Sequence, residues 1–443
     1  MRAINNLKLI ILHNSALYQL KEEVKMSFNP FKQKATTVEK GLENWQKIFV
    51  PSYDKTSTDP FTKLRIILMN GTEFEANWYS HQFSRHCTDN ELRREIAKIR
   101  RVEQQQQKKI SGLKPLNESI LETTIGYEQL AVELTANLAR REKDDYVREA
   151  LDFALLEDFD HLYRFSNLLK MEHGIDASKL VDCRTEITPG RPTVCEHRLA
   201  PDDVRHHIDA EKSDPFTRLC CSIITAAEQQ TMNYYMNIAG FYTSELGRKL
   251  FSEIAMIEEQ HVTQYGSLVD VKCSWLTGLL EHEYTECYLY WSCLMDETDS
   301  RIKSIWEVCL EQELAHLHRV AELLEKYENK PYTDVFPCPE FPEPLTFGCD
   351  NIDYVRKVLK KTAWYTSVGE GYADVRDMDC EYPFFTWQEK LNGCGDHTPS
   401  HQVIDLYINN FKEDFRLETD KNPVKELQNR QKDNVSVGRC CKK

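Results

Sequence analysis

The fold is decided by the stretch EQQTMNYYMNIAGFYTSELGRKLFSEIAMIEEQH, residues 228–261. It begins with Glu228 and ends with Glu258 and His261, which are three residues apart. Residues three apart lie on one face of a helix, so this carboxylate and this imidazole can reach the same ion or two adjacent ions. Ser244, a favoured residue for the start of a helix, divides the stretch in two. We therefore predict a helical hairpin with one acidic residue on its first helix and a Glu-x-x-His motif on its second.

The same arrangement recurs along the chain. In three sets, an acidic residue lies thirty positions before the carboxylate of a carboxylate-x-x-His motif: Glu128 with Asp158 and His161, Glu228 with Glu258 and His261, and Glu283 with Glu313 and His316. A fourth motif, Asp203 with His206, has His173 at the earlier position and does not complete a set. The three complete sets predict three hairpins of one design.

These acidic residues fall on apolar helical faces. Glu128 shares its face with Leu121 and Ile125, and Glu258 lies one turn from Ile254. A carboxylate buried on such a face is costly unless it is paired or bound to a metal. Oxygen and nitrogen ligands without thiolate suit iron or manganese, and zinc is a further possibility. The alternative is a buried layer of ion pairs or hydrogen bonds between the histidines and the acids.

Helix-capping residues place the six core helices. We expect them to begin near Asn117, Asp144 or Asp145, Pro215, Ser244, Ser274 and Asp299, with the last ending before Pro331. The predicted fold is therefore mainly α-helical, an antiparallel bundle of about six core helices with less regular N- and C-terminal regions. We divide the chain into an N-terminal region (1–114), the bundle (115–330), a proline-rich segment with a C-terminal helical region (331–418) and a disordered tail (419–443).

The N-terminal region gives mixed signals. Leu64–Met69 reads LRIILM and predicts either a strand or a buried helical turn. A basic helix is expected from Asn90 to Lys109. We interpret its charges as a solvated face, with Ile96 and Ile99 on the opposite side, and not as a nucleic-acid surface.

Composition limits the function classes. The net charge of −15 argues against nucleic acid as a partner. No apolar run is long enough to cross a bilayer, so we expect no membrane partner, and the patch at residues 9–12 is too short for a signal-peptide core. The fifteen cysteines show no framework spacing. We expect mostly reduced thiols and a cytoplasmic location.

Residues 117–329 resemble the ferritin-like superfamily, especially rubrerythrin and bacterioferritin, in which Glu and E-x-x-H precede a long crossover and a second Glu and E-x-x-H. This sequence departs from the family in having Asp158 in place of Glu, a Glu-to-E-x-x-H spacing about one helical turn shorter, and a third hairpin. The resemblance implies two iron or manganese ions per bundle and a non-haem oxidoreductase of the peroxidase, catalase or oxygenase type. It would act on oxygen or peroxide.

Further expectations come with this resemblance. Glu286 resembles the additional carboxylate that rubrerythrins use in metal movement, and Tyr235 could donate to the site or become redox-active. No C-x-x-C motif occurs, so we expect no rubredoxin-type iron site, and no haem. Electrons would come from a partner or from an unknown substrate. Two alternatives remain: a metal-storage or ferroxidase protein, and a non-catalytic helical scaffold with a buried polar core. A homo-oligomer is a further possibility in each case.

The pairing of the hairpins has three alternatives. A crossover of about forty residues between the first two hairpins can run the length of a helix of about 36 Å, whereas five residues cannot. Chain length therefore pairs the first two hairpins. Ligand identity pairs the second with the third, because both carry Glu with Glu-x-x-His. All three hairpins could also converge on one core.

Overall fold

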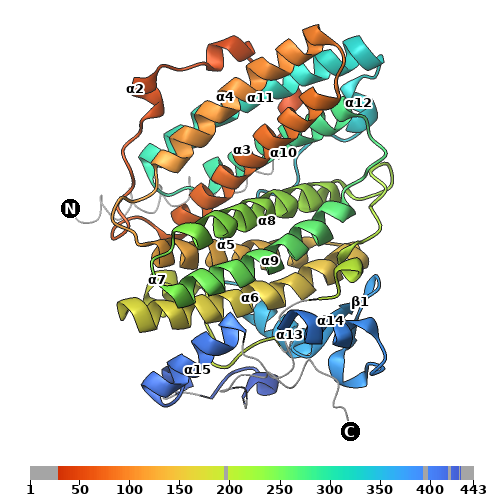
Figure 1. Ribbon diagram of the computed structural model, residues 1–443. Coiled ribbons are helices and arrows are strands. Elements are labelled where there is room, and N and C mark those ends of the chain that lie inside the picture. Colours follow the sequence, from red (N-terminus) through yellow and green to blue (C-terminus); the bar gives the residue numbers. More distant parts are fainter. Residues whose placement is uncertain (1–27, 194–197, 393–397, 418–420, 429, 431–443) are drawn as a thin grey trace, which may run out of the picture.

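The computed structural model describes residues 28–193, 198–392, 398–417, 421–428 and 430. Within these ranges the chain forms fourteen helices and one two-stranded sheet, which confirms the prediction of a mainly α-helical fold. Figure 1 shows two stacked groups of long helices with a smaller C-terminal region below them. The patch at residues 9–12 lies outside the described residues.

The first bundle contains two of the three predicted hairpins. It consists of α5 (Ile120–Arg141), α6 (Asp145–His173), α8 (Pro215–Phe241) and α9 (Glu245–Leu268). Helices α5 and α6 form one hairpin, and α8 and α9 form the other. The hairpins pack together through contacts of α5 with α8 and of α6 with α9.

Local sequence explains where these helices begin and end. Ser119, and not the predicted Asn117, caps α5: its hydroxyl accepts a hydrogen bond from the Glu122 N–H at 3.2 Å, and the Glu122 carboxylate accepts one from the Ser119 N–H at 2.8 Å. Asp144 caps α6 as predicted. Helix α6 ends at Gly174 with φ 68°, a left-handed conformation that glycine adopts readily.

The second bundle contains the third predicted hairpin and an additional one. It consists of α3 (Pro60–His86), α4 (Asn90–Gly112), α10 (Trp275–Asp296) and α11 (Ser300–Glu328). Helix α3 contacts α10, and α4 contacts α11. The long-helix architecture therefore begins at Pro60, well before the boundary expected at residue 114, and it has eight long helices in the described residues where about six were expected.

Both N-terminal helices match the sequence patterns within them. Leu64–Met69 lies inside α3 and is buried throughout, so the helical alternative is correct for this segment. Helix α4 contains the predicted basic helix. Ile96 and Ile99 are buried in the bundle, and Arg94 pairs with Glu91 on the exposed side. Arg93, Arg94, Lys98 and Arg101 are exposed and form a solvated helix face, whereas Lys109 is buried and pairs with Glu43.

An internal repeat relates the two halves of the long-helix region. The sequence DPFTKL at residues 59–64 recurs as DPFTRL at residues 214–219, 155 positions later. The same shift maps α3, α5 and α6 onto α8, α10 and α11 with both bounds of each helix preserved. Helix α4 maps onto α9 to within one residue. Each repeat therefore contributes two hairpins in the same order.

The hairpins pair across the repeats. The second hairpin of the first repeat (α5–α6) packs with the first hairpin of the second repeat (α8–α9). The outer hairpins, α3–α4 and α10–α11, form the other bundle. The segment between α6 and α8, which includes α7 (Ser178–Val181), is long enough to run the length of a helix.

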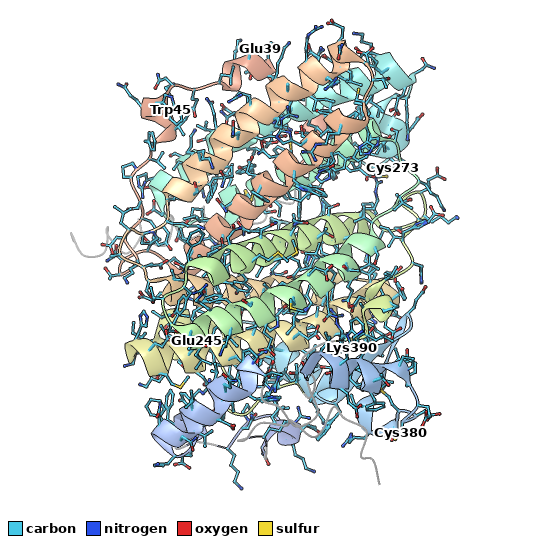
Figure 2. The ribbon with its side chains drawn as sticks, viewed as in Figure 1. Glu39, Trp45, Glu245, Cys273, Cys380 and Lys390 are labelled. Carbon is cyan, nitrogen blue, oxygen red and sulfur yellow. The ribbon has the colours of Figure 1, made fainter. Side chains whose placement is uncertain are left out.

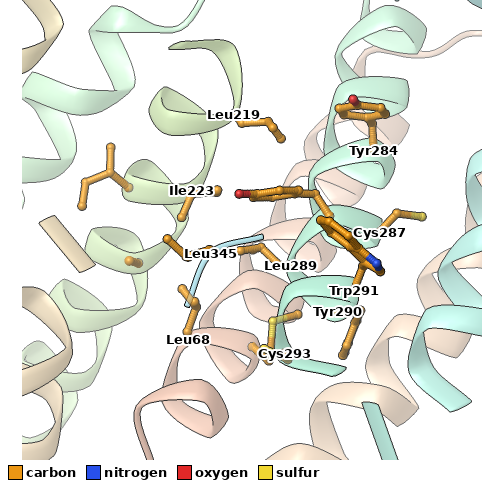
Figure 3. Close-up of a cluster of buried hydrophobic side chains, with 14 of the residues drawn as sticks. Leu68, Leu219, Ile223, Tyr284, Cys287, Leu289, Tyr290, Trp291, Cys293 and Leu345 are labelled. Atoms are coloured by element: carbon orange, nitrogen blue, oxygen red, sulfur yellow. The ribbon is translucent and has the colours of Figure 1, made fainter. Parts of the chain in front are cut away.

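One apolar core joins the two bundles. Figure 3 shows Leu68 of α3, Leu219 and Ile223 of α8 and Leu289 of α10 in the same cluster, with Leu345 from the segment after α11. All five side chains are buried. Helix α3 contacts both α5 and α8. The bundles therefore share hydrophobic contacts, and neither is an isolated module.

The C-terminal region covers the outer side of the first bundle. It contains α13 (Ile352–Thr362), the antiparallel strands β1 (Tyr365–Val368) and β2 (Gly371–Asp374), α14 (Pro383–Asn392) and α15 (Pro399–Phe411). The short α12 (Tyr332–Val335) follows α11 and contacts that helix of the second bundle. Helices α13 and α15 pack on α6, and α15 also packs on α9. Near the N-terminus lies the short α2 (Trp45–Ile48). Short 3-10 helices occupy Pro30–Lys32, Val38–Gly41, Asp182–Arg184, Ala200–Asp203, Val375–Asp377, Phe415–Leu417 and Lys425–Leu427.

The described part of the tail is packed, contrary to the expectation of disorder from residue 419. Val424 and Leu427 are buried, and the backbone oxygen of Arg430 accepts a hydrogen bond from the Arg191 N–H at 3.0 Å. The expectation for residues 431–443 lies outside the described residues.

Two further findings concern the membrane and cysteine predictions. None of the helices in the described ranges is both long enough and apolar enough to cross a bilayer. Nine cysteines in those ranges are free thiols, whereas Cys380 is disulfide-bonded. The expectation of reduced thiols therefore holds for these nine cysteines and is wrong at Cys380.

Candidate metal centres

The first centre lies inside the first bundle. It comprises Glu128 of α5, Asp158 and His161 of α6, Glu228 of α8, and Glu258 and His261 of α9. Each of the four helices thus supplies an acidic side chain, and both second helices add a histidine one turn further on. All six side chains are at most 1% exposed. Figure 2 shows side chains filling the interior between these helices.

The six residues form two groups that share a border at Glu258. Glu128, His161 and Glu258 offer ligand atoms within 4.8 Å of one another, and so do Asp158, Glu228 and His261. Oε1 of Glu258 lies 2.7 Å from His161 Nδ1, while its Oε2 lies 3.4 Å from His261 Nδ1. Glu258 therefore faces both groups.

A second carboxylate orients His261. The Nε2–H of His261 donates to Oε2 of Glu157 at 2.9 Å, and Glu157 in turn lies 3.5 Å from Nη2 of Arg198. Burial raises the pKa of Glu157, but Arg198 and His261 outweigh burial, so this pKa is lowered overall. With Nε2 protonated, Nδ1 of His261 is left to face Asp158 at 3.4 Å. Glu157 was not among the predicted site residues.

Tyr235 and Thr135 hold two of the acidic side chains. The Tyr235 hydroxyl donates to Oε1 of Glu128, and the Thr135 hydroxyl donates to Oδ2 of Asp158 at 3.3 Å. Burial, followed by the nearby Glu128, raises the pKa of Tyr235 well above its usual value. Tyr235 therefore remains a protonated donor at neutral pH.

Burial strongly perturbs the acids themselves. It raises the pKa of Glu128 and of Asp158 well above the usual range, with further contributions from Glu258 and Glu228 respectively. It also raises the pKa of Glu258 to about 8, against the lowering effect of His261. Without a compensating cation, these groups hold protons that ordinary carboxyl groups lose well below neutral pH.

Several inward-facing polar atoms of this centre have no hydrogen-bond partner among the described residues. They are Oε2 of Glu128, Oδ1 of Asp158, both oxygens of Glu228, Oε2 of Glu258 and Nδ1 of His261. Buried polar atoms without partners are uncommon in folded proteins. Oxygen and imidazole acceptors that face one another without donors between them fit a bound cation.

The remaining predicted residues belong to a second centre in the other bundle. Glu283 and Glu286 of α10 and Glu313 and His316 of α11 are all buried there. Glu73 of α3 and Glu103 and Gln106 of α4 face them from the other hairpin, and these seven residues are called the second centre below. Of the three alternatives for hairpin pairing, the one based on crossover length matches the structure.

Sequence reasoning missed Glu73, Glu103 and Gln106. The search began from histidines, and the motif in α4 is Glu103-x-x-Gln106. Glu73 nevertheless precedes Glu103 by the same thirty residues as in the other three sets. Two signals in the sequence identify this fourth hairpin: the thirty-residue spacing of Glu73 and Glu103, and the 155-residue repeat that relates them to Glu228 and Glu258.

Comparison of the chain with protein-family models, with curated proteins and with solved structures finds no match. The residues of the two centres therefore provide the evidence for function.

Proposed function

We propose that the chain is a non-haem two-metal oxidoreductase that acts on oxygen or peroxide, built on a ferritin-like first bundle. The observation that carries this proposal is the first centre, where four carboxylates and two imidazoles from four helices converge in a buried interior. This is the ligand set of carboxylate-bridged two-metal bundles. Each of its two groups, defined above, would hold one ion, and Glu258 is suited to bridge them.

The ligand set favours iron or manganese. It offers only carboxylate oxygens and imidazole nitrogens, which suit these metals better than a thiolate site would. Cysteines in the long helices do not change this preference. Burial raises the pKa of Cys221 and of Cys287 well above the usual value, so both thiols stay protonated. We propose neither haem nor a rubredoxin-type iron site.

The protein's own residues would prepare the site. Four ionised carboxylates balance the charge of two divalent ions, which removes the cost of burying them. Glu157 keeps the proton of His261 on Nε2, so that Nδ1 can serve as a ligand. Tyr235 fixes Glu128 and places a phenolic proton beside the centre. A pair of iron or manganese ions, when bound, supplies the one-electron redox changes that oxygen or peroxide chemistry requires.

Metal analysis of the full chain tests this proposal. Protein purified anaerobically is loaded with Fe²⁺ or Mn²⁺, desalted and analysed, alongside Glu258→Ala and His261→Ala. Glu258→Ala should lose about two ions per chain relative to the wild type, and His261→Ala should lose about one. Glu259→Ala, an exposed neighbour on α9, is the matched control and should retain them. Unchanged metal content in both site variants, with a melting temperature indifferent to chelator, contradicts the proposal.

Activity assays then separate the function classes. Consumption of peroxide or of oxygen with a reductant, lost in Glu258→Ala, supports an oxidoreductase. Oxidation of added Fe²⁺ with accumulation of ferric mineral and a cage-sized particle supports storage instead. Metal binding with neither activity contradicts the enzymatic proposal and leaves a metal-stabilised scaffold.

A further inference from the structure

The second bundle contains a buried acidic cluster that the proposed function does not use. We infer that it is a separate metal centre with two unequal positions. One position contains nitrogen and is formed by Glu103, Glu283 and His316. The other is formed by oxygen ligands alone, from Glu283, Glu286 and Glu313. This inference does not require the first centre to be catalytic.

The nitrogen-containing position is the repeat-related copy of one in the first centre. A shift of 155 residues maps Glu128 and His161 onto Glu283 and His316, and it maps Glu103 onto Glu258. The three residues of each set offer ligand atoms within 4.8 Å of one another. Each bundle therefore brings together two glutamates and one histidine at equivalent places. In both bundles the histidine and one glutamate come from one repeat, and the other glutamate comes from the other repeat.

Buried acceptors without partners mark this position. Neither carboxylate oxygen of Glu103 or of Glu283 has a hydrogen-bond partner among the described residues. Both side chains are 0% exposed. His316 points Nδ1 toward Glu283, at 3.6 Å, and toward Glu313, at 3.2 Å. A cation is the ligand that such a group of acceptors can bind.

The other position has been altered at two points. The 155-residue shift maps Gln106 onto His261, so the imidazole of the first centre is replaced by an amide. It also maps Gln312 onto Glu157, so the carboxylate that orients that imidazole is replaced as well. Gln106 donates from Nε2 to Oε1 of Glu313 at 2.6 Å. The second bundle therefore lacks the equivalents of both His261 and Glu157 and has a glutamine in each place.

An additional carboxylate is present where the imidazole is lost. Glu286 lies one turn after Glu283, and the equivalent residue of the first repeat is Ala131. Glu286 is 1% exposed, and neither of its oxygens has a hydrogen-bond partner among the described residues. One oxygen from each of Glu283, Glu286 and Glu313 lies within 4.8 Å of the other two. The altered position thus offers three carboxylates as ligands, with Gln106 and His316 in contact with Glu313.

The charge of the cluster argues against a self-contained polar layer. Five buried carboxylates gather here: Glu73, Glu103, Glu283, Glu286 and Glu313. Within the described residues, no lysine or arginine forms an ion pair with any of them, and His316 is the basic side chain in contact. The Tyr290 hydroxyl donates to Glu73. One imidazole and two neutral donors do not compensate five ionised carboxylates, so the cluster either binds a cation or keeps protons on its acids.

Ligand chemistry then separates the positions. Imidazole suits Fe²⁺, Co²⁺ and Zn²⁺, whereas carboxylate oxygens alone suit Mg²⁺, Ca²⁺ and Mn²⁺. Among the described residues, three of these positions contain an imidazole, two in the first centre and one in the second. We expect Co²⁺ to fill these three tightly, and Mn²⁺ to fill the oxygen-only position as well.

Anaerobic titration of the full chain with Co²⁺ or Mn²⁺ alone, followed by dialysis and elemental analysis, tests this inference. Wild type should retain about three Co²⁺. His316→Ala and Glu103→Gln should each lose about one Co²⁺ and retain the two of the first centre. Glu286→Gln should reduce Mn²⁺ binding and leave Co²⁺ binding unchanged. Near-ultraviolet and far-ultraviolet circular dichroism verify that each variant is folded.

A reciprocal exchange provides the matched control. Gln106→His combined with Gln312→Glu restores the histidine–carboxylate pair in the second bundle and should raise tightly bound Co²⁺ by about one ion. His261→Gln should lower it by about one. Wild-type Co²⁺ content that is unchanged by His316→Ala and Glu103→Gln overturns the inference. Equal Co²⁺ affinity at all four positions would contradict the claim that the two positions of the second centre differ in their metal preference. Glu258→Ala reports on metal binding at the first centre alone. A lack of metal binding at the first centre can therefore be distinguished from a lack of metal binding at the second.

Discussion

Glu157 shows how a residue outside the ligand set can control it. Its contact with Nε2 of His261 determines which imidazole nitrogen faces the acids, and Arg198 holds Glu157 in place. A carboxylate that accepts from the far nitrogen of a metal-binding histidine also makes that histidine a stronger ligand. Glu157 lies next to Asp158 in sequence, where sequence reasoning had no separate signal for it.

We predict that Glu157→Gln weakens metal binding at the first centre about 10- to 100-fold, because a neutral amide supports the imidazole less well and no longer forms an ion pair with Arg198. The second centre should bind as in wild type, since Gln312 stands at the equivalent position there. Competition with a chelator of known affinity measures both. Glu149→Gln, on the exposed side of α6, is the control. Equal weakening of both centres would indicate a general loss of packing instead.

At the scale of the helices, the two longest end in the same way. Helix α6 ends at Gly174 with φ 68°, and the repeat-related α11 ends at Asn329 with φ 54°. Both are residues that tolerate left-handed backbone better than most. Such ends stop each long helix at the same distance from its ligands, so the repeat preserves helix length as well as ligand spacing.

We predict that Gly174→Ala destabilises the protein by about 1 kcal/mol, because alanine is strained at this backbone conformation although nothing lies within 4 Å of an added Cβ. Gly240→Ala is the control of opposite sign. Gly240 is an exposed residue of α8 with free space for a Cβ, so alanine should stabilise by about 0.5–1 kcal/mol. Urea unfolding monitored by circular dichroism gives both values. Two changes of the same sign would refute the backbone argument.

The helices illustrate which features the sequence predicts. Apolar periodicity and capping residues identified α5, α6, α8, α9, α10 and α11, because these signals are local. Helix α3 was ambiguous, since Leu64–Met69 is apolar throughout and short apolar runs fit a strand or a helix. Its partner α4 was assigned to the surface from its many charges, which gave no indication that Glu103 is 0% exposed.

The candidate sites divide in the same manner. The sequence brought Glu128, Asp158 and His161 into one set because spacing along a helix is a local property. That Glu73 and Glu103 face Glu283 is a long-range pairing, decided by how hairpins pack, and a search for histidines could not find it. Whether any of these residues binds metal stays a prediction, which the experiments above test.

At the scale of the whole molecule, the two centres concentrate buried acid in one protein. Burial raises the pKa of Glu258 to about 8 and that of Glu103 to about 7. In the unfolded chain such groups titrate near 4.5. The metal-free folded state therefore keeps protons that the unfolded state loses between these values. The histidines of the centres add to the same trend, because the pKa of His261 and that of His316 are raised.

We predict that the metal-free protein loses stability as the pH rises from about 5 to 8, by up to about 1.4 kcal/mol per pH unit for each such group. Saturating Mn²⁺ should reverse the trend, because the ion displaces these protons and binds more tightly as the pH rises. Thermal unfolding between pH 5 and 8, with and without Mn²⁺, measures this. Stability of the metal-free protein that is flat or rises over this range would contradict the prediction.

The pairing of hairpins across the repeats has a consequence for how the chain is synthesised. The hairpin α3–α4 leaves the ribosome early, but its partner α10–α11 ends at Glu328. Between these events α5–α6 and α8–α9 are complete and can close the first bundle around their own acids. The hairpin α3–α4 lacks its partner hairpin until α10 and α11 have been synthesised, and until then Glu73 and Glu103 are not covered by those helices. The order of the hairpins along the chain therefore allows the first bundle to form before the second. A chain that ends before α10 would contain all four helices of the first bundle but only α3 and α4 of the second.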